Sequence, residues 1–296
     1  MTTGVLLMTY GAPRDATDLP AYLARVRGGR IPDDALVAEM RRRYDQIGGS
    51  PLIRITEAQA ASLEVSLGQS FRVRAAMRYS EPTIADQAQD LADAEQVIGI
   101  VLSPQWSPTL MRGYADALRS AVARPVRMVG AWHREPAFVG ALARQVRTAR
   151  TRLRQPHVVF TAHSLPRRVF ELEPEYVAQL RETGELVAAA AGLDPGEWTW
   201  AYQSAGHTQE EWLRPDLKEL FPDLAAAGHR DVLVAPVQFL ADHLEVLYDL
   251  DIAAAAEAAA AGLRYHRVPM PNCDAAFIDA LAGIVRREAA ALSPAG

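Results

Sequence analysis

The chain has 296 residues and a formal net charge of −5, and 49% of its residues are hydrophobic. This length favours two domains or one large one, and the composition excludes a disordered, collagen-like or coiled-coil chain. The mildly acidic balance argues against a nucleic-acid partner, and a single cysteine, Cys273, excludes an intrachain disulfide, a zinc ribbon and a four-cysteine iron–sulfur cluster.

Short apolar runs alternate with helical patterns along the whole chain. Continuous runs of this kind, bounded by proline, glycine, serine or histidine, are typical of strands buried on both faces of a sheet. The predicted strands are 4–9, 71–77, 97–102, 126–131, 157–162, 198–202, 231–235 and 263–267. The predicted helices include 33–46, 57–67, 81–92, 112–122, 137–152, 177–191, 214–226 and 275–291, and Thr56 with Gln59 resembles a capping box.

The alternation of strands and helices predicts parallel βαβ units, and the strands divide four and four near residues 134–156. We therefore expect an α/β fold with two similar doubly wound domains, each a four-stranded parallel sheet flanked by helices. The first would comprise residues 1–135 with a returning C-terminal helix in 274–296, and the second residues 136–273. Ligands bind at the carboxyl ends of strands in such sheets, so we expect an active cleft between the domains.

Several nucleotide and hydrolase motifs are missing from the sequence. It contains no G-x-G-x-x-G, no Walker loop and no G-x-S-x-G elbow, which disfavours a dinucleotide site, a nucleoside triphosphate site and an α/β-hydrolase. No segment resembles a signal peptide or a membrane helix of about 20 apolar residues. We therefore expect a cytoplasmic protein without membrane insertion.

Histidine and carboxylate side chains follow two of the predicted strands. His163 ends the fifth strand, where a neutral imidazole would ligate a metal or accept a proton; the alternative is a buried histidine bonded to backbone. Asp242, Glu245 and Asp249 have the spacing i, i+3, i+7, which places them on one face of a helix. They form either a path for a hard cation or a solvated helix face.

Tyrosine and arginine side chains cluster near the start of the chain. Tyr10 follows the first strand and is either a phenolate ligand or a capped core tyrosine. Arg27 and Arg30 flank a Gly-Gly pair and form either a clamp for carboxylates or two exposed surface arginines.

Five sequence blocks resemble the ferrochelatase family, and the similarity runs from residue 5 to about residue 291. The blocks are LLMTYGAP at 6–13, YDQIGGSPL at 44–52, AHSLP at 162–166, YQSAGHT at 202–208 and FLADHLEVLYD at 239–249. The order and separation of AHSLP and ADHLEVLYD are the most specific part of this resemblance. It implies two Rossmann-like domains that hold a free-base porphyrin while Fe²⁺ enters and two pyrrole protons leave.

The resemblance also implies roles for three of the residues introduced above. His163 would be the catalytic base and iron ligand, with Glu245 as its partner in proton or metal handling, and Asp249 would continue an acidic track outward. A rigid pocket complementary to a bent porphyrin would lower the barrier to metal entry.

Tyr10 is similar to a tyrosine of the coproporphyrin III branch, found in Gram-positive-type bacteria, whose substrate carries four propionates. By the same resemblance, Arg27, Arg30, Ser50 and Tyr114 would bind those propionates. The sequence departs from the family in three places. The stretch before Ser50 is one residue short, Gly28 replaces an arginine of some relatives, and Ala253 replaces an acid.

The resemblance leads us to expect coproporphyrin III and Fe²⁺ as substrates, no resident cofactor and no iron–sulfur cluster, a monomer, and a downstream decarboxylase that makes haem. The alternatives are a protoporphyrin IX ferrochelatase and another metallochelatase that inserts iron or cobalt into sirohydrochlorin. An alternative of a different class is a porphyrin or haem carrier that performs no insertion.

Overall fold

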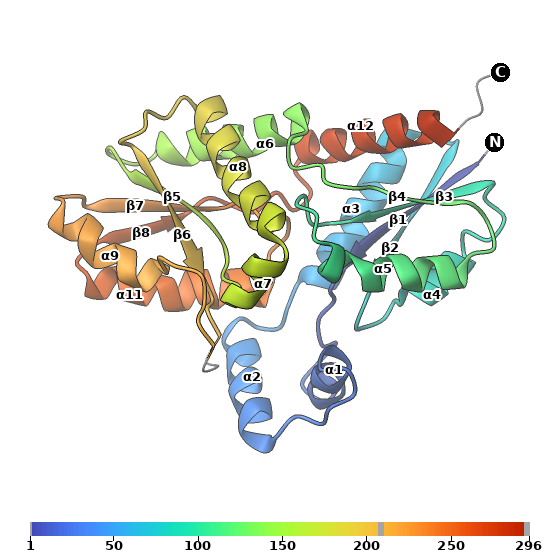
Figure 1. Cartoon of the computed structure of the whole chain (residues 1–296), viewed down its shortest axis with the longest axis horizontal. Helices are drawn as coiled ribbons and strands as arrows, with labels where there is room; N and C mark the ends of the chain where they lie inside the picture. The colour runs from blue at the N-terminus through green and yellow to red at the C-terminus, as the bar shows by residue number, and fades with distance from the viewer. Residues whose placement is uncertain (1, 207–209, 293–296) are drawn as a thin grey trace. The chain divides into compact units, whose positions relative to one another are not determined.

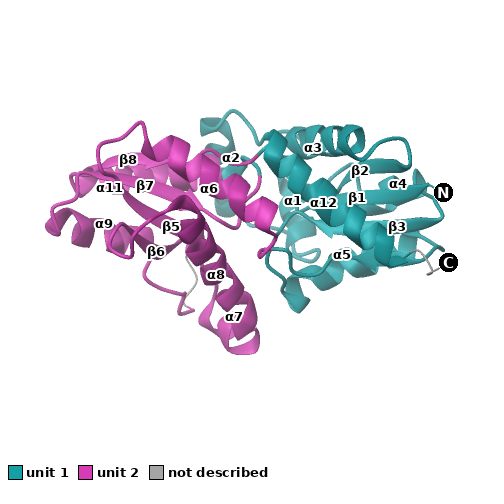
Figure 2. Ribbon diagram, turned by 90° about the horizontal axis from the view of Figure 1, so that it is seen from above, with its two compact units in different colours: residues 1–132, 241–244, 272–296 teal, residues 133–240, 245–271 magenta. Residues whose placement is uncertain are grey.

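The computed structural model describes residues 2–206 and 210–292, so the last two residues of the YQSAGHT block, His207 and Thr208, lie outside the described residues. The chain divides into two compact units (Figure 2). Unit 1 comprises Met1–Trp132, Ala241–Leu244 and Asn272–Gly296, and unit 2 comprises His133–Leu240 and Glu245–Pro271. Residues 241–244 lie in unit 1, although the predicted limits assign them to the second domain.

Within the described residues, unit 1 forms a four-stranded parallel sheet in the order β2-β1-β3-β4. The strands are β1 (Thr3–Thr9), β2 (Phe71–Met77), β3 (Gln96–Val101) and β4 (Val126–Met128). The helices are α1 (Leu19–Val26), α2 (Asp34–Gln46), α3 (Leu52–Leu67), α4 (Ile84–Gln89), α5 (Pro108–Ala121) and α12 (Ala275–Leu292). Helices α3 and α12 cover one face of the sheet and α4 and α5 the other (Figure 1), which buries apolar strand residues such as Leu6 and Val97 completely.

The part of unit 2 that the structure describes repeats this topology in the order β6-β5-β7-β8, again all parallel. The strands are β5 (His157–His163), β6 (Trp198–Gln203), β7 (Asp231–Pro236) and β8 (Arg264–Arg267). The helical segments are α6 (Pro136–Arg150), α7 (Arg167–Leu172), α8 (Pro174–Ala191), α9 (Leu217–Ala226), α10 (Leu244–Leu247), the π-helix η1 (Asp249–Ala254) and α11 (Ala255–Ala260). The predicted fold class is confirmed.

The predicted capping box is wrong. Helix α3 begins at Leu52, before the predicted start, and the Leu52 side chain is buried in a cluster with Ala12 and Ala241. Thr56 therefore lies inside α3 and donates its hydroxyl hydrogen to the Leu52 carbonyl (2.8 Å). Gln59 is also buried and donates to the carbonyl of Asn272 (2.8 Å), so both side chains stabilise the interior of unit 1.

The shared helix face predicted for Asp242, Glu245 and Asp249 is also wrong. Asp242 precedes α10 and lies in unit 1, where its backbone N–H and its carboxylate both bond to the Asn272 side chain (2.9 and 2.8 Å). Beyond α10 the backbone changes from α- to π-helical at Asp249. The wider turn of a π-helix breaks the spacing on which the prediction depended.

Candidate active site

His163 is the last residue of β5 and therefore lies at the carboxyl end of the unit 2 sheet. Its backbone N–H donates to Oε1 of Gln238 (2.9 Å), and Nε2 of Gln238 donates to the hydroxyl of Tyr176 (2.8 Å). Tyr176 is fully buried, and this burial raises the pKa of its phenol, which stays neutral. A hydrogen-bonded chain anchored on a buried tyrosine thus fixes the strand end that carries His163.

The ring orientation of His163 settles which nitrogen is available for chemistry. Its Nδ1 lies 2.5 Å from the carbonyl oxygen of Ser164. A carbonyl only accepts hydrogen bonds, so Nδ1 carries the proton and Nε2 of the neutral ring presents a lone pair. This Nε2 faces Oε2 of Glu245 at 4.0 Å, and the two side chains are 25% and 42% exposed. Metal–nitrogen and metal–oxygen bonds are each about 2 Å long, so one metal ion fits between the two atoms.

An indole lies beside this histidine. The centroid of the Trp212 ring is 6.4 Å from that of His163, and the Trp212 backbone pairs with Pro166, three residues beyond His163. A Cβ on Gly206 would come within 2.5 Å of the Trp212 ring, so only glycine at position 206 leaves room for the indole. The site therefore has an apolar aromatic side as well as a basic nitrogen.

Asp249 does not complete a three-residue metal site. In residues 2–206 and 210–292 no group of three or more histidine, cysteine, aspartate or glutamate side chains is placed to hold a metal ion. Asp249 is half-buried at the start of η1. Of the three predicted metal-binding residues, the structure thus pairs His163 with Glu245 only.

Two further acids in unit 2 were missed by the sequence analysis. Burial raises the pKa of Asp216, the N-cap of α9, while a charged His163 would lower it, which places this carboxyl within electrostatic reach of the imidazole. Burial and the charge of Asp216 together raise the pKa of Glu257 in α11. The available signal was the Asp-x-x-Glu capping box of Asp216 and Glu219, which marks a helix start but no chemistry.

In unit 1, aromatic rings and a guanidinium gather at the carboxyl ends of β1 and β2. Tyr10 is 45% exposed, which excludes the core alternative, and its ring lies 4.6 Å from that of Tyr79. Arg78 lies over the rings of Tyr79 (4.9 Å) and Tyr114 (5.1 Å), and burial raises the pKa of the Tyr114 phenol. The sequence indicated specific roles for Tyr10 and Tyr114, whereas Arg78 and Tyr79 were recognised only as residues that follow a predicted strand.

The other residues predicted to bind propionates lie on the surface of unit 1. Arg27 is the C-cap of α1, and both it and Arg30 are exposed without an ion pair among the described residues. Ser50 precedes α3, and its hydroxyl oxygen accepts a long hydrogen bond from the Leu52 N–H (3.4 Å). The structure joins Tyr10 and Tyr114 through Tyr79 and Arg78.

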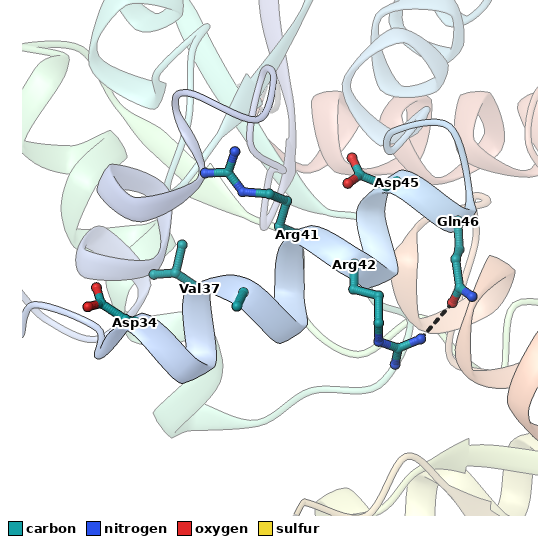
Figure 3. Close-up of a pocket in the computed structure, with 7 residues that line it drawn as sticks. Asp34, Val37, Arg41, Arg42, Asp45 and Gln46 are labelled. Atoms are coloured by element: carbon teal, nitrogen blue, oxygen red, sulfur yellow. Dashed lines mark hydrogen bonds between the residues drawn. The ribbon is translucent and has the colours of Figure 1, made fainter.

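Two surface hollows in unit 1 are lined by other residues. One, of about 600 Å³, follows a single face of α2, where Nη1 of Arg42 donates to the Gln46 side chain at 2.9 Å (Figure 3). The second, of about 290 Å³, is lined by Pro13, Arg14, Asp15, Ala16, Leu19, Arg41, Tyr44, Asp45, Gly48 and Gly49. Neither contains a predicted site residue. In the described part of the chain, no helix is both long and apolar enough to span a membrane.

Comparison with known proteins gives close sequence relatives over the full chain. The ferrochelatase family profile matches residues 2–289. A ferrochelatase of Deinococcus radiodurans is 38% identical over 97% of this chain and 96% of its own length. A coproporphyrin III ferrochelatase of Geobacillus kaustophilus is 37% identical over 96% of this chain and 95% of its own length.

Solved structures of two other chelatases share the fold. SirB from Bacillus subtilis, determined with Fe³⁺, has a TM-score of 0.62 at 12% identity, covering 98% of this chain and 96% of its own. CbiX, described as the terminal enzyme of sirohaem biosynthesis in denitrifying bacteria, has a TM-score of 0.61 at 17% identity, covering 99% of this chain and all of its own. Likeness at these identities shows the fold alone.

Proposed function

The chain belongs to the ferrochelatase family and is a metal chelatase, and on this premise we propose that it inserts Fe²⁺ into coproporphyrin III, forming coprohaem in haem biosynthesis. The observation that carries this proposal is the Nε2 lone pair of His163, which faces the Glu245 carboxylate across 4.0 Å. Because both groups are partly exposed, a porphyrin and an incoming ion can reach them.

The proposed mechanism assigns the base to His163. Free-base porphyrin carries two pyrrole N–H protons, which must leave as the metal enters. His163 accepts the two protons one after the other at Nε2, because the Ser164 carbonyl holds the other ring proton at Nδ1. Glu245 stabilises the imidazolium that forms and passes the proton on to solvent, to which its side chain is 42% exposed. Iron, the second substrate, would bind Nε2 and Oε2 on its way to the ring, and the Nε2 lone pair would accept the pyrrole protons after the iron has left it.

The choice of coproporphyrin III is supported by the similarity of the chain to coproporphyrin III ferrochelatases and by the side chains of unit 1. Tyr10 is exposed and would present its phenol to the flat porphyrin. Arg27 and Arg30 offer guanidinium groups that pair in bidentate fashion with propionates, and Ser50 and Tyr114 offer hydroxyl groups. Asp249 is proposed as an outer acid on the iron path rather than as a third ligand.

We also propose that the enzyme carries no resident cofactor, since its iron is a substrate and Cys273 is its single thiol. We infer a cytoplasmic monomer that passes coprohaem to a decarboxylase. The retained propionates of coprohaem require such a step before haem is complete.

The test is an anaerobic absorbance assay of the purified protein with Fe²⁺ and, separately, coproporphyrin III, protoporphyrin IX and sirohydrochlorin. We expect multiple turnovers, with the highest kcat/KM for coproporphyrin III. Equal or better use of protoporphyrin IX would overturn the substrate choice. Turnover of sirohydrochlorin alone would replace the proposed reaction with another chelatase reaction, and tight porphyrin binding without turnover would indicate a carrier.

A further inference from the structure

Arg78 holds an unpaired positive charge between two aromatic rings. It directly follows β2, and its guanidinium carbon lies 4.9 Å from the ring centroid of Tyr79 and 5.1 Å from that of Tyr114. Its Nη1 donates to the Leu110 carbonyl (3.1 Å). No carboxylate pairs with this arginine among the described residues, so most of its N–H groups are left for a ligand.

The helix next to this guanidinium is shaped to admit it. Gly113 lies inside α5, where glycine is less favourable than alanine. A Cβ at this position would come within 2.1 Å of Nη2 and 2.4 Å of Cζ of Arg78. The glycine thus leaves the space that the guanidinium occupies, and the two rings and the Leu110 carbonyl hold the guanidinium there.

An arginine that only filled space would not need its charge. A half-buried charge without a counter-ion is costly, and an apolar side chain would pack against two tyrosines without that cost. A guanidinium held against aromatic rings keeps the N–H groups that make no internal hydrogen bond, and the geometry of such N–H groups matches the two oxygens of a carboxylate. The Arg78 guanidinium is also linked to Tyr10, the residue proposed to face the porphyrin, because the Tyr79 ring contacts both of them and lies 4.6 Å from the Tyr10 ring.

We propose that Arg78 is a specificity-determining residue that binds one carboxylate of the porphyrin substrate, with Tyr79 and Tyr114 fixing its guanidinium. This inference rests on the proposed function. Under this proposal, Tyr114 contributes to propionate binding through its ring, which holds the Arg78 guanidinium, rather than through its hydroxyl group.

The experiment measures the dissociation constants of metal-free coproporphyrin III and of its tetramethyl ester, together with KM and kcat for insertion. The variants are Arg78→Gln, which removes the charge, and Gly113→Ala, which keeps the charge but displaces the guanidinium. Arg119→Gln is the matched control, because Arg119 is an exposed arginine of α5 without an ion pair among the described residues.

We expect Arg78→Gln to raise the dissociation constant and KM for coproporphyrin III about 10-fold or more, with kcat within twofold and ester binding unchanged. Gly113→Ala should act in the same direction without lowering Tm, since alanine favours the helix, and Arg119→Gln should match the wild type. Dissociation constants within twofold of wild type for both Arg78→Gln and Gly113→Ala, or equal losses for acid and ester, would overturn this inference. A wild type that binds coproporphyrin III but never metallates it would overturn the proposed function alone, because the binding comparison still decides the role of Arg78.

Discussion

The two units share one sheet topology but present different side chains at the carboxyl ends of equivalent strands. In each, the first strand of the unit occupies the second place in the sheet order, β1 in unit 1 and β5 in unit 2. The carboxyl end of β1 is followed by Tyr10, among aromatic rings and the Arg78 guanidinium, whereas β5 ends in His163, which faces a carboxylate. If the proposed roles hold, equivalent strands deliver a binding group in one unit and a basic nitrogen in the other, and the side chain rather than the topology sets the role.

The contacts that hold the ends of β1 and β5 in place also differ. His163 is held through its backbone by Gln238, which leaves the ring free to present Nε2. After Tyr10 the chain turns at Gly11, which has φ +97°, and a Cβ there would lie 2.2 Å from the Ser80 hydroxyl oxygen. Unit 2 therefore fixes a single reactive atom, while unit 1 fixes a turn that exposes a broad ring.

A large expected effect at Glu245 tests whether unit 2 performs the chemistry. Glu245→Gln keeps the size of the side chain but removes its charge and basicity. We expect kcat for Fe²⁺ insertion to fall about 100-fold, within the usual range for a lost acid–base group, with coproporphyrin III binding unchanged. Steady-state absorbance kinetics measure the first quantity and porphyrin fluorescence the second. Glu185→Gln, at an exposed acid of α8, is the matched control, and a kcat within threefold of wild type for Glu245→Gln would refute the assignment.

A second prediction contrasts the two ends of β5. His157, its first residue, is buried, and burial with the nearby His229 lowers its pKa to about 4 from an ordinary value of 6.5. The folded state therefore binds this proton less readily than the unfolded state. The free energy of unfolding is unaffected by this group above pH 6.5 and decreases as the pH falls from 6.5 toward 4. The loss attributable to this group is about 3 kcal/mol.

Denaturant unfolding from pH 4 to pH 7 measures this loss. We expect His157→Gln to reduce the pH dependence by that amount, and His229→Gln, which removes a neighbouring charge, to reduce it by less. Identical pH profiles for wild type and His157→Gln would show that the imidazole at this end is not buried in neutral form. Neither variant should change kcat, because His157 begins β5 and His229 precedes β7, which places both at the amino end of the sheet and His163 at its carboxyl end.

The smallest expected effect concerns Tyr10, which follows the carboxyl end of β1 in unit 1. Tyr10→Phe removes one hydroxyl but keeps the ring packed on Tyr79. We expect kcat to change less than about fivefold, while the visible spectrum and the dissociation constant of bound coprohaem shift because a phenol ligand is lost. A product spectrum identical to that of the wild type would show that Tyr10 is not a ligand of the product iron.

The strands could be predicted closely from the sequence, and parts of the site could not. Burial on both faces leaves continuous apolar runs, so β2 begins and ends at the predicted residues and β7 extends only one residue further. The residues alone left His163 open between a core histidine and a ligand, and only the family resemblance favoured the second. Its tautomer depends on the Ser164 carbonyl, which no sequence pattern specifies.

Other features depend on tertiary packing and carry weak local signals. The π-helix at Asp249 interrupts an alanine-rich segment that reads as ordinary α-helix, and helix propensity does not distinguish the two. The position of Arg78 between Tyr79 and Tyr114 joins segments more than thirty residues apart. Gly113, inside an otherwise regular helical pattern, was the one local hint of that contact.

The most direct test of the division between the units is a side-by-side measurement of kcat and of metal-free coproporphyrin III affinity for His163→Ala. If unit 2 supplies the base, kcat falls at least 100-fold while the dissociation constant stays within about threefold of wild type. Insertion at the wild-type rate, or a loss of porphyrin affinity as large as the loss of rate, would contradict the assignment of the chemistry to the imidazole at the end of β5.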